Sequence, residues 1–134
     1  MRYVLLVSND ETAAISPQER SRRETAFRWF QNQMRSHATP LAGERLQAGK
    51  TATTVRCWDG GDVIISPGSN AAPAEQLTGV YVVDCENLDD AIEVATTIPA
   101  AWYGTVEVRP VRAEMPMQQD RFADEDSSVI LAAG

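Results

Sequence analysis

The chain has 134 residues, with 12 basic against 19 acidic side chains and a formal net charge of −7. This length predicts one domain, large enough to fold without a metal or a disulfide. The negative charge argues against binding of nucleic acid and of anionic membranes through a broad basic surface. No apolar run approaches the roughly 20 residues that a membrane-spanning helix needs. The first apolar run is short and is followed by Asp10 and Glu11, unlike a secretion signal, so we expect a cytoplasmic protein.

The cysteine and histidine pattern predicts no metal site. Cys57 and Cys85 are too far apart for a CxxC motif, and a single histidine cannot complete a Cys/His zinc set. Each cysteine lies in a strand-like segment, where we expect a buried free thiol. The chain also lacks a phosphate-binding loop, a GxGxxG motif and a Ser/His/Asp order, so no cofactor is expected and enzymatic activity is left open.

The first half of the chain predicts a strand followed by a long helix. Residues 2–8 form an apolar run typical of a buried central strand. Ser16 is a suitable N-cap, followed by proline at the first helical position, and the helix should end near Ser36 or His37. The core face is predicted at Phe27, Phe30 and Met34. The neighbouring Trp29 projects away from that face, toward a flank or another subunit.

The remaining strands and the second helix are predicted from the same features, namely apolar runs, turn residues and a helix cap. A short extended segment is expected at 41–46, and a hairpin at 51–58 and 63–66, joined by an Asp-Gly-Gly-Asp turn. Residues 67–74 form a loop, and another strand covers 79–84. Asn87 should cap a second helix with a core stripe, and the last strand spans 105–111. The predicted stripe contains Leu88, Ala91, Ile92 and Ala95.

This order of elements predicts an α+β domain with a ferredoxin-like split βαβ arrangement and an inserted hairpin. Both helices cover one face of the sheet, and the other face is left open. We expect a homodimer through this open sheet face. Candidate residues for it are Tyr3, Thr54, Arg56, Trp58 and Tyr81.

Several segments resemble the YCII-related proteins, specifically the DGPF-domain branch. They include the opening Met-Arg-Tyr-Val-Leu-Leu-Val, the Ser-Pro-Gln-Glu-Arg helix start and Gly43-Glu44-Arg45-Leu46. Residues 52–56, 75–79 and 98–110 extend the resemblance in the family's order and spacing, over about residues 1–111. The resemblance implies the dimeric α+β barrel fold.

Two family signatures differ in this chain. The Asp-Gly-Pro-Phe motif of the branch falls on residues 67–70, where only Gly68 matches, so the motif is degenerate. Sister proteins carry a His–Asp pair with the histidine near the start of the first helix. The only histidine here, His37, lies at the end of that helix, which leaves this pair absent.

We predict that a small polar ligand binds in a cavity near the dimer interface. Glu44 and Arg56 could orient such a ligand, or could form a structural salt bridge between strands. The same alternative holds for Glu107 and Arg109, which alternate onto one face of the last strand. The remaining candidates come from the variable loop and from the segment before the last strand: Ser69, Asn70, Trp102 and Tyr103.

The alternative is a non-enzymatic accessory or regulatory protein. DGPF-type proteins resemble partners of sigma-factor-type transcriptional control, and residues 17–36 carry five arginines against two glutamates. Such a basic helix is either a solvated face or a contact for an acidic partner. Residues 112–134 are predicted to form an acidic tail with a short apolar end, either docked or disordered.

Overall fold

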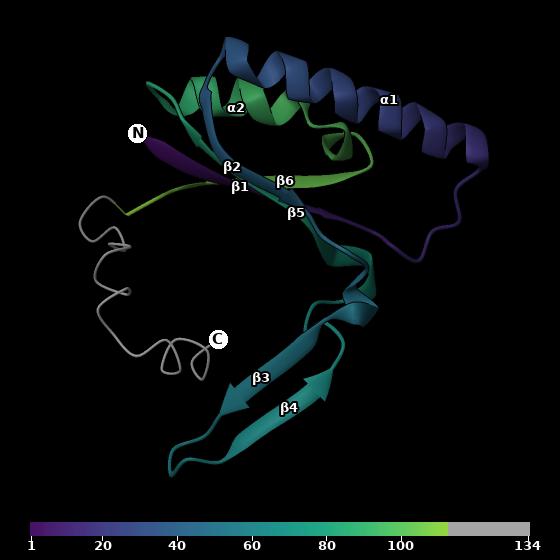
Figure 1. Ribbon diagram of the computed structural model, residues 1–134, viewed down its shortest axis with the longest axis vertical. Coiled ribbons are helices and arrows are strands. Elements are labelled where there is room, and N and C mark those ends of the chain that lie inside the picture. Colours follow the sequence, from purple (N-terminus) through teal and green to yellow (C-terminus); the bar gives the residue numbers. More distant parts are fainter. Residues whose placement is uncertain (113–134) are drawn as a thin grey trace.

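Four strands and two helices form the body of the computed structural model, which describes residues 1–112 (Figure 1). The antiparallel sheet has the order β2-β5-β1-β6, and both helices lie on one of its faces. The predicted ferredoxin-like arrangement is therefore confirmed. The strands are β1 (Arg2–Asn9), β2 (Thr39–Arg45), β5 (Gln76–Asp84) and β6 (Gly104–Pro110), and the helices are α1 (Pro17–Gln33) and α2 (Leu88–Thr97).

Strand β1 is central because it pairs with β5 on one side and β6 on the other. Its residues alternate in burial: Tyr3, Leu5 and Val7 are buried under the helices, whereas the intervening residues are only half-buried. Tyr3 and Tyr81 were expected as candidates for the open face. That expectation is wrong, since they are 3% and 6% exposed within the core.

Helix α1 begins as predicted, with the Glu19 backbone N–H donating to the Ser16 hydroxyl at 3.0 Å. It ends at Gln33 and continues for one short 3₁₀ turn, Met34–Ser36. Phe30 and Met34 are buried, and Phe27 packs against the core from its edge, so the predicted core face is confirmed. Trp29 is 54% exposed.

Helix α2 is capped by Asn87, whose side-chain oxygen accepts from the Asp90 N–H at 2.9 Å. Its buried side is centred on Val94, together with Ala91 and Ala95. Leu88 and Ile92 are 49% and 43% exposed, so their placement in the core stripe is wrong. Ile92 lies about 200° around the helix from Val94, which turns its side chain toward the surface.

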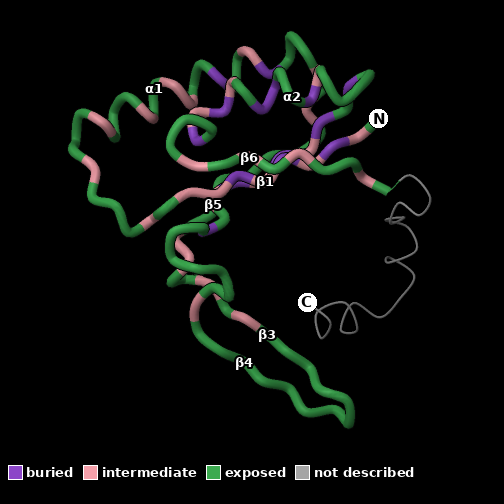
Figure 2. The backbone as a smooth tube through the Cα atoms, turned by 180° about the vertical axis from the view of Figure 1, so that it is seen from behind, coloured by how far each residue is buried: buried purple, intermediate pink, exposed green. Residues whose placement is uncertain are grey.

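The strands β3 (Thr53–Cys57) and β4 (Val63–Pro67) form a separate two-stranded sheet, not part of the main one. This hairpin extends away from the body on the side opposite the helices (Figures 1 and 2). Its turn needs glycine, because Gly60 and Gly61 have φ angles of 99° and 95°. Three further open-face candidates, Thr54, Arg56 and Trp58, lie on this hairpin instead of the main sheet.

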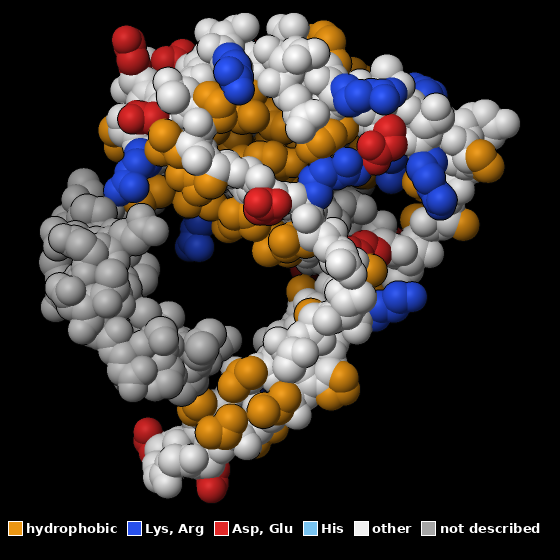
Figure 3. Space-filling model, in the orientation of Figure 1, with side chains coloured by type: hydrophobic (Ala, Val, Ile, Leu, Met, Phe, Trp, Pro, Cys, Tyr) orange, Lys and Arg blue, Asp and Glu red, His pale blue; other side chains and the backbone are white. Residues whose placement is uncertain are grey.

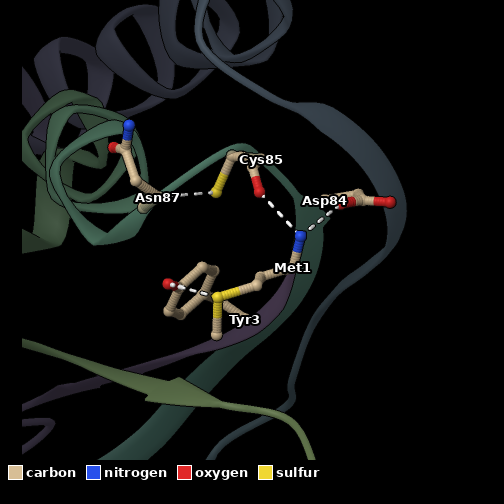
Figure 4. A network of polar contacts seen from close by, with 5 residues as sticks. All are labelled: Met1, Tyr3, Asp84, Cys85 and Asn87. Atoms are coloured by element: carbon tan, nitrogen blue, oxygen red, sulfur yellow. Dashed lines mark hydrogen bonds and ion pairs between the residues drawn. The ribbon is translucent and has the colours of Figure 1, made fainter. Parts of the chain in front are cut away.

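The two cysteines lie in different environments. Cys85 is buried as expected, whereas Cys57 is exposed on the hairpin, so the prediction of a buried thiol there is wrong. Cys85 belongs to a polar network that ties the start of β1 to the end of β5 (Figure 4). The Met1 amine donates to the Cys85 carbonyl at 2.9 Å and to an Asp84 carboxylate oxygen at 3.2 Å. Burial raises the pKa of the Cys85 thiol, which keeps it protonated.

Candidate functional site

A small recess lies between α1 and the helix-covered side of the sheet, with a volume of about 180 Å³. Its apolar lining includes Phe27, Tyr81 and Ile98, and its polar lining includes Asn9, Arg23, Arg45, Thr78 and Tyr103. Gly43 helps to position the Tyr81 ring, because a Cβ at that position would come within 2.6 Å of Tyr81 Cδ1. The recess is therefore formed by the ends of β1 and β2, the first half of β5, the middle of α1 and the segment between α2 and β6.

Two arginines lie against aromatic rings of this recess. The Arg23 guanidinium lies 3.5 Å from the centre of the Tyr103 ring and pairs with Glu19 at 3.2 Å. Arg45 lies 4.2 Å from the Phe27 ring and pairs with Glu24 at 2.5 Å. These contacts hold both cations at the wall of the recess.

Both tyrosine hydroxyls of the recess remain protonated donors at neutral pH. Burial raises the pKa of Tyr81 and of Tyr103, and the nearby Arg45 offsets part of that rise for each. A neutral phenol beside a guanidinium offers hydrogen-bond donors to a ligand oxygen.

The Glu24–Arg45 pair gives one pH-dependent prediction. Hydrogen bonding to Arg45 lowers the pKa of Glu24 below its ordinary 4.5. The ion pair therefore stabilises the fold above pH 4.5, and this stabilisation is lost as the pH falls through the lowered pKa of Glu24. Both side chains are about half exposed, which limits the pair to about 0.5 kcal/mol. Urea unfolding should show Glu24→Gln less stable than wild type at about pH 7 and equal to it at about pH 3. Glu93→Gln, an exposed position on α2, is the control; a pH-independent difference for Glu24→Gln would contradict the assignment.

A larger cleft of about 670 Å³ adjoins the recess and shares Asn9 and Arg23 with it. Its walls come from four parts of the chain: the β1–α1 connection, the first half of α1, the short turn at Gly49–Thr51 and the loop after β4. Its charged and polar lining includes Asp10, Glu11, Arg20, Arg23, Lys50, Ser69 and Gln76.

The acidic groups of this cleft already have partners. Asp10 accepts from the Thr12 hydroxyl and N–H at 2.5 and 2.8 Å, which lowers the pKa of its carboxyl. Glu11 accepts from the Gly49 N–H at 2.9 Å. Arg20 and Lys50, by contrast, make no side-chain hydrogen bond or ion pair within residues 1–112. Asp10 and Glu11 keep their negative charge, whereas Arg20 and Lys50 have side-chain donors left to offer a ligand.

Gln76 fixes the loop that forms one wall of the cleft. Its side-chain amide donates to the carbonyls of Ala71 and Ala72, both at 3.0 Å. Gly49 must lack a side chain here, because a Cβ would clash with the Gln76 amide oxygen. The described residues hold no group of three metal-ligating side chains and no helix that could span a membrane.

Comparison with known proteins assigns a family to this fold. The model of the YCII-related domain matches residues 1–116. The chain belongs to the YCII-related family. The predicted resemblance is thus confirmed at the level of the family, and the narrower DGPF-domain branch stays a prediction.

A relative of this YCII-related chain is an uncharacterised protein of Rhizobium meliloti (strain 1021). It is 32% identical over 120 residues, which cover 87% of this chain and 96% of that protein.

The residues predicted to bind a ligand in this YCII-related chain lie in three places. The open face of the main sheet carries Glu44, Glu107 and Arg109. Glu44 and Glu107 stand at the two ends of one row of side chains that crosses β2, β5, β1 and β6. Three interstrand spacings separate them by about 14 Å. The described residues contain no ion pair between Glu44 and Arg56.

The loop residues lie at the base of the hairpin. Arg56 donates to the side-chain oxygen of Asn70 at 3.3 Å, and the Ser69 hydroxyl accepts from the Ala71 N–H at 3.0 Å. Ser69 also lines the cleft. Tyr103 lines the recess, and its neighbour Trp102 is 86% exposed beside it.

The interpretation of the sequence missed the arginines that line the recess and the cleft. Arg20, Arg23 and Phe27 follow one another at spacings of three and four residues, on the stripe that continues to Phe30. A cation on the core-facing stripe of a helix is the signal that could have identified them.

Proposed function

We propose that this YCII-related chain is a homodimeric binding protein for a small anionic molecule, which occupies the recess and the adjoining cleft. The combined space suits a small ligand, since ligand pockets of proteins measure roughly 300–1,000 Å³. The recess supplies an apolar floor with two phenol donors, and the cleft supplies charge.

Two cations of the cleft without a side-chain partner among the described residues are the observation that carries this proposal. Asp10 and Glu11 already accept hydrogen bonds from the chain, whereas Arg20 and Lys50 have no side-chain partner among the described residues. A carboxylate or phosphate group would complete the hydrogen bonding of both cations. Ser69 and Asn9 add neutral polar groups that could bind the rest of the ligand.

Titration calorimetry with inorganic phosphate and with succinate tests this proposal. Wild type should bind at least one of these probes, and the double variant Arg20→Ala, Lys50→Ala should bind it about tenfold more weakly or worse, because charge-assisted hydrogen bonds are lost. Arg35→Ala is the matched control, since Arg35 is exposed and lies outside the cleft. No binding by wild type, or equal binding by the double variant, would contradict the proposal.

The homodimer part of the proposal rests on the open face of the main sheet. The register places Val4 opposite Val82 and Leu6 opposite Val80, with all four side chains only half-buried on the face opposite α1 and α2. An apolar centre with charged edges is typical of a face that packs on another protein surface.

An accessory or regulatory role is the second candidate, favoured by a groove beside the recess. Trp29 and Trp102 line it at 54% and 86% exposure, together with Arg22. Tryptophan and arginine are the residues most enriched at the energetic centres of protein interfaces. An acidic partner, such as a protein of sigma-factor-type transcriptional control, would fit this basic helix.

Charge reversal on the exposed side of α1 separates the two candidates. Arg22→Glu with Arg28→Glu should abolish capture of a partner by the full-length chain and leave phosphate and succinate binding unchanged. Arg23 is kept because it lines the recess. A double variant that captures the same proteins as wild type would rule out the accessory role.

A further inference from the structure

The β3–β4 hairpin presents one apolar face to solvent. Its register pairs Val55 with Ile65 and Cys57 with Val63, so these four side chains lie on the same side of the hairpin, which we call the arm face. Val55, Val63 and Ile65 are 57%, 57% and 67% exposed. Hydrophobic side chains are visibly gathered on the hairpin in Figure 3.

The opposite face of the hairpin mixes polar and hydrophobic side chains. It carries Thr54, Arg56, Ile64 and Ser66, and Trp58, 57% exposed, takes the next position of the same alternation. Arg56 and Thr54 make hydrogen bonds to the loop at the base of the hairpin. The arm face is thus the entirely apolar side of the hairpin, and no segment of residues 1–112 covers it. An isolated two-stranded hairpin is marginally stable in water, so this arrangement needs a surface to pack on.

A second copy of this chain provides that surface. The hairpin extends from the main sheet on the side away from the helices, which is also the side of the open face (Figures 1 and 2). A protein packed on the open face therefore meets the hairpin. In a two-fold dimer the hairpin of each copy contacts the other copy in the same way, so that both open faces and both arm faces are covered at once.

The area of the open face supports this occupant. Four strands about 4.8 Å apart and seven residues long cover roughly 450 Å², whereas a stable interface buries about 800 Å² on each partner. Two strands of five residues add roughly 160 Å². The open face and the hairpin together present roughly 610 Å² on each copy, which reaches the lower bound of about 600 Å² per partner for a specific interface, whereas the open face alone does not.

We propose that the β3–β4 hairpin is an arm that packs its apolar arm face on the second copy of this chain in the homodimer. This inference rests on the proposed homodimer and adds the element that completes its interface.

Sedimentation equilibrium of the full-length chain tests the arm. The double variant Val55→Thr, Ile65→Thr keeps residues that favour strands but removes apolar area from the arm face. It should raise the dissociation constant of the dimer by about tenfold or more. Ile64→Thr makes the same kind of change on the opposite face of the same hairpin, and it should leave that constant unchanged.

Alkylation of Cys57 by iodoacetamide gives a second readout without any substitution. Cys57 lies on the arm face and is the exposed cysteine of the pair, since Cys85 is buried. Modification of Cys57 should slow several-fold when the protein concentration rises above the dissociation constant of the dimer.

The outcomes separate the arm from the homodimer. A wild-type chain that stays monomeric overturns both. A wild-type dimer that is unaffected by Val55→Thr, Ile65→Thr, with Cys57 equally reactive at all concentrations, overturns the arm alone. A variant that lowers the stability of the monomer and leaves dimerisation unchanged would mean that the arm face is covered within its own chain, which also overturns the arm.

Discussion

Replacing Phe30 with alanine should lower the free energy of unfolding by about 3–5 kcal/mol. Phe30 has no exposed surface, and its ring packs edge-on against Tyr81 with centroids 5.3 Å apart. Because domains of this size are stable by about 5–15 kcal/mol, the loss would be a large fraction of the total. Urea denaturation of both proteins measures it directly.

Trp29→Ala is the matched control for this substitution. Trp29 precedes Phe30 on the same helix but is 54% exposed, so the loss should stay below about 1 kcal/mol. Equal losses for the two variants would show that α1 does not pack on the sheet through Phe30.

A charge in the centre of the open face should separate the proposed dimer into monomers. Val82 is half-buried on β5 and lies opposite Val4 in the middle of this face. Val82→Arg would bury an unpaired guanidinium between the two copies, which costs several kcal/mol or more. Sedimentation velocity should therefore find a monomer at concentrations where wild type is a dimer.

The fold of the monomer should survive this change, because neither α1 nor α2 packs on the open face. Circular dichroism checks that point. Glu93→Arg, on the exposed side of α2, introduces the same side chain elsewhere and should leave the dimer intact. A Val82→Arg protein that sediments with wild type would contradict a dimer through this face.

Local chemistry accounts for the parts of the fold that could be predicted. Ser16 and Asn87 are caps whose effect depends on two or three neighbouring N–H groups, and both helices begin where they were expected. The Gly60-Gly61 turn is equally local, since its positive φ angles favour glycine. The order of these elements was then sufficient for the ferredoxin-like arrangement.

Relations between distant segments account for the predictions that failed. Alternation along a strand indicates two faces but does not say which one the helices cover, so Tyr3 and Tyr81 were placed on the wrong one. Cys57 has the surroundings of a strand residue in the sequence, yet its strand belongs to a hairpin outside the main sheet. Burial there depends on what packs against the hairpin.

The candidate site shows the same limit. The cleft joins residues near positions 10, 20, 50 and 70, and no spacing along the chain relates them. Ser69 and Tyr103 were predicted as site residues and do line the cleft and the recess, whereas Arg23 was interpreted as part of a basic helix surface. Its contact with the Tyr103 ring depends on how α1 packs beside the start of β6.

The most direct test of the proposed ligand site is an NMR titration. The backbone amide shifts of the wild-type chain are mapped while inorganic phosphate or succinate is added. We expect the shifts to change around residues 10–13, 20–23, 48–50 and 69–76, which surround the cleft. The amides of the α2 surface should stay unchanged. Shifts confined to another surface, or no shifts with either probe, would contradict an anion-binding cleft at this site.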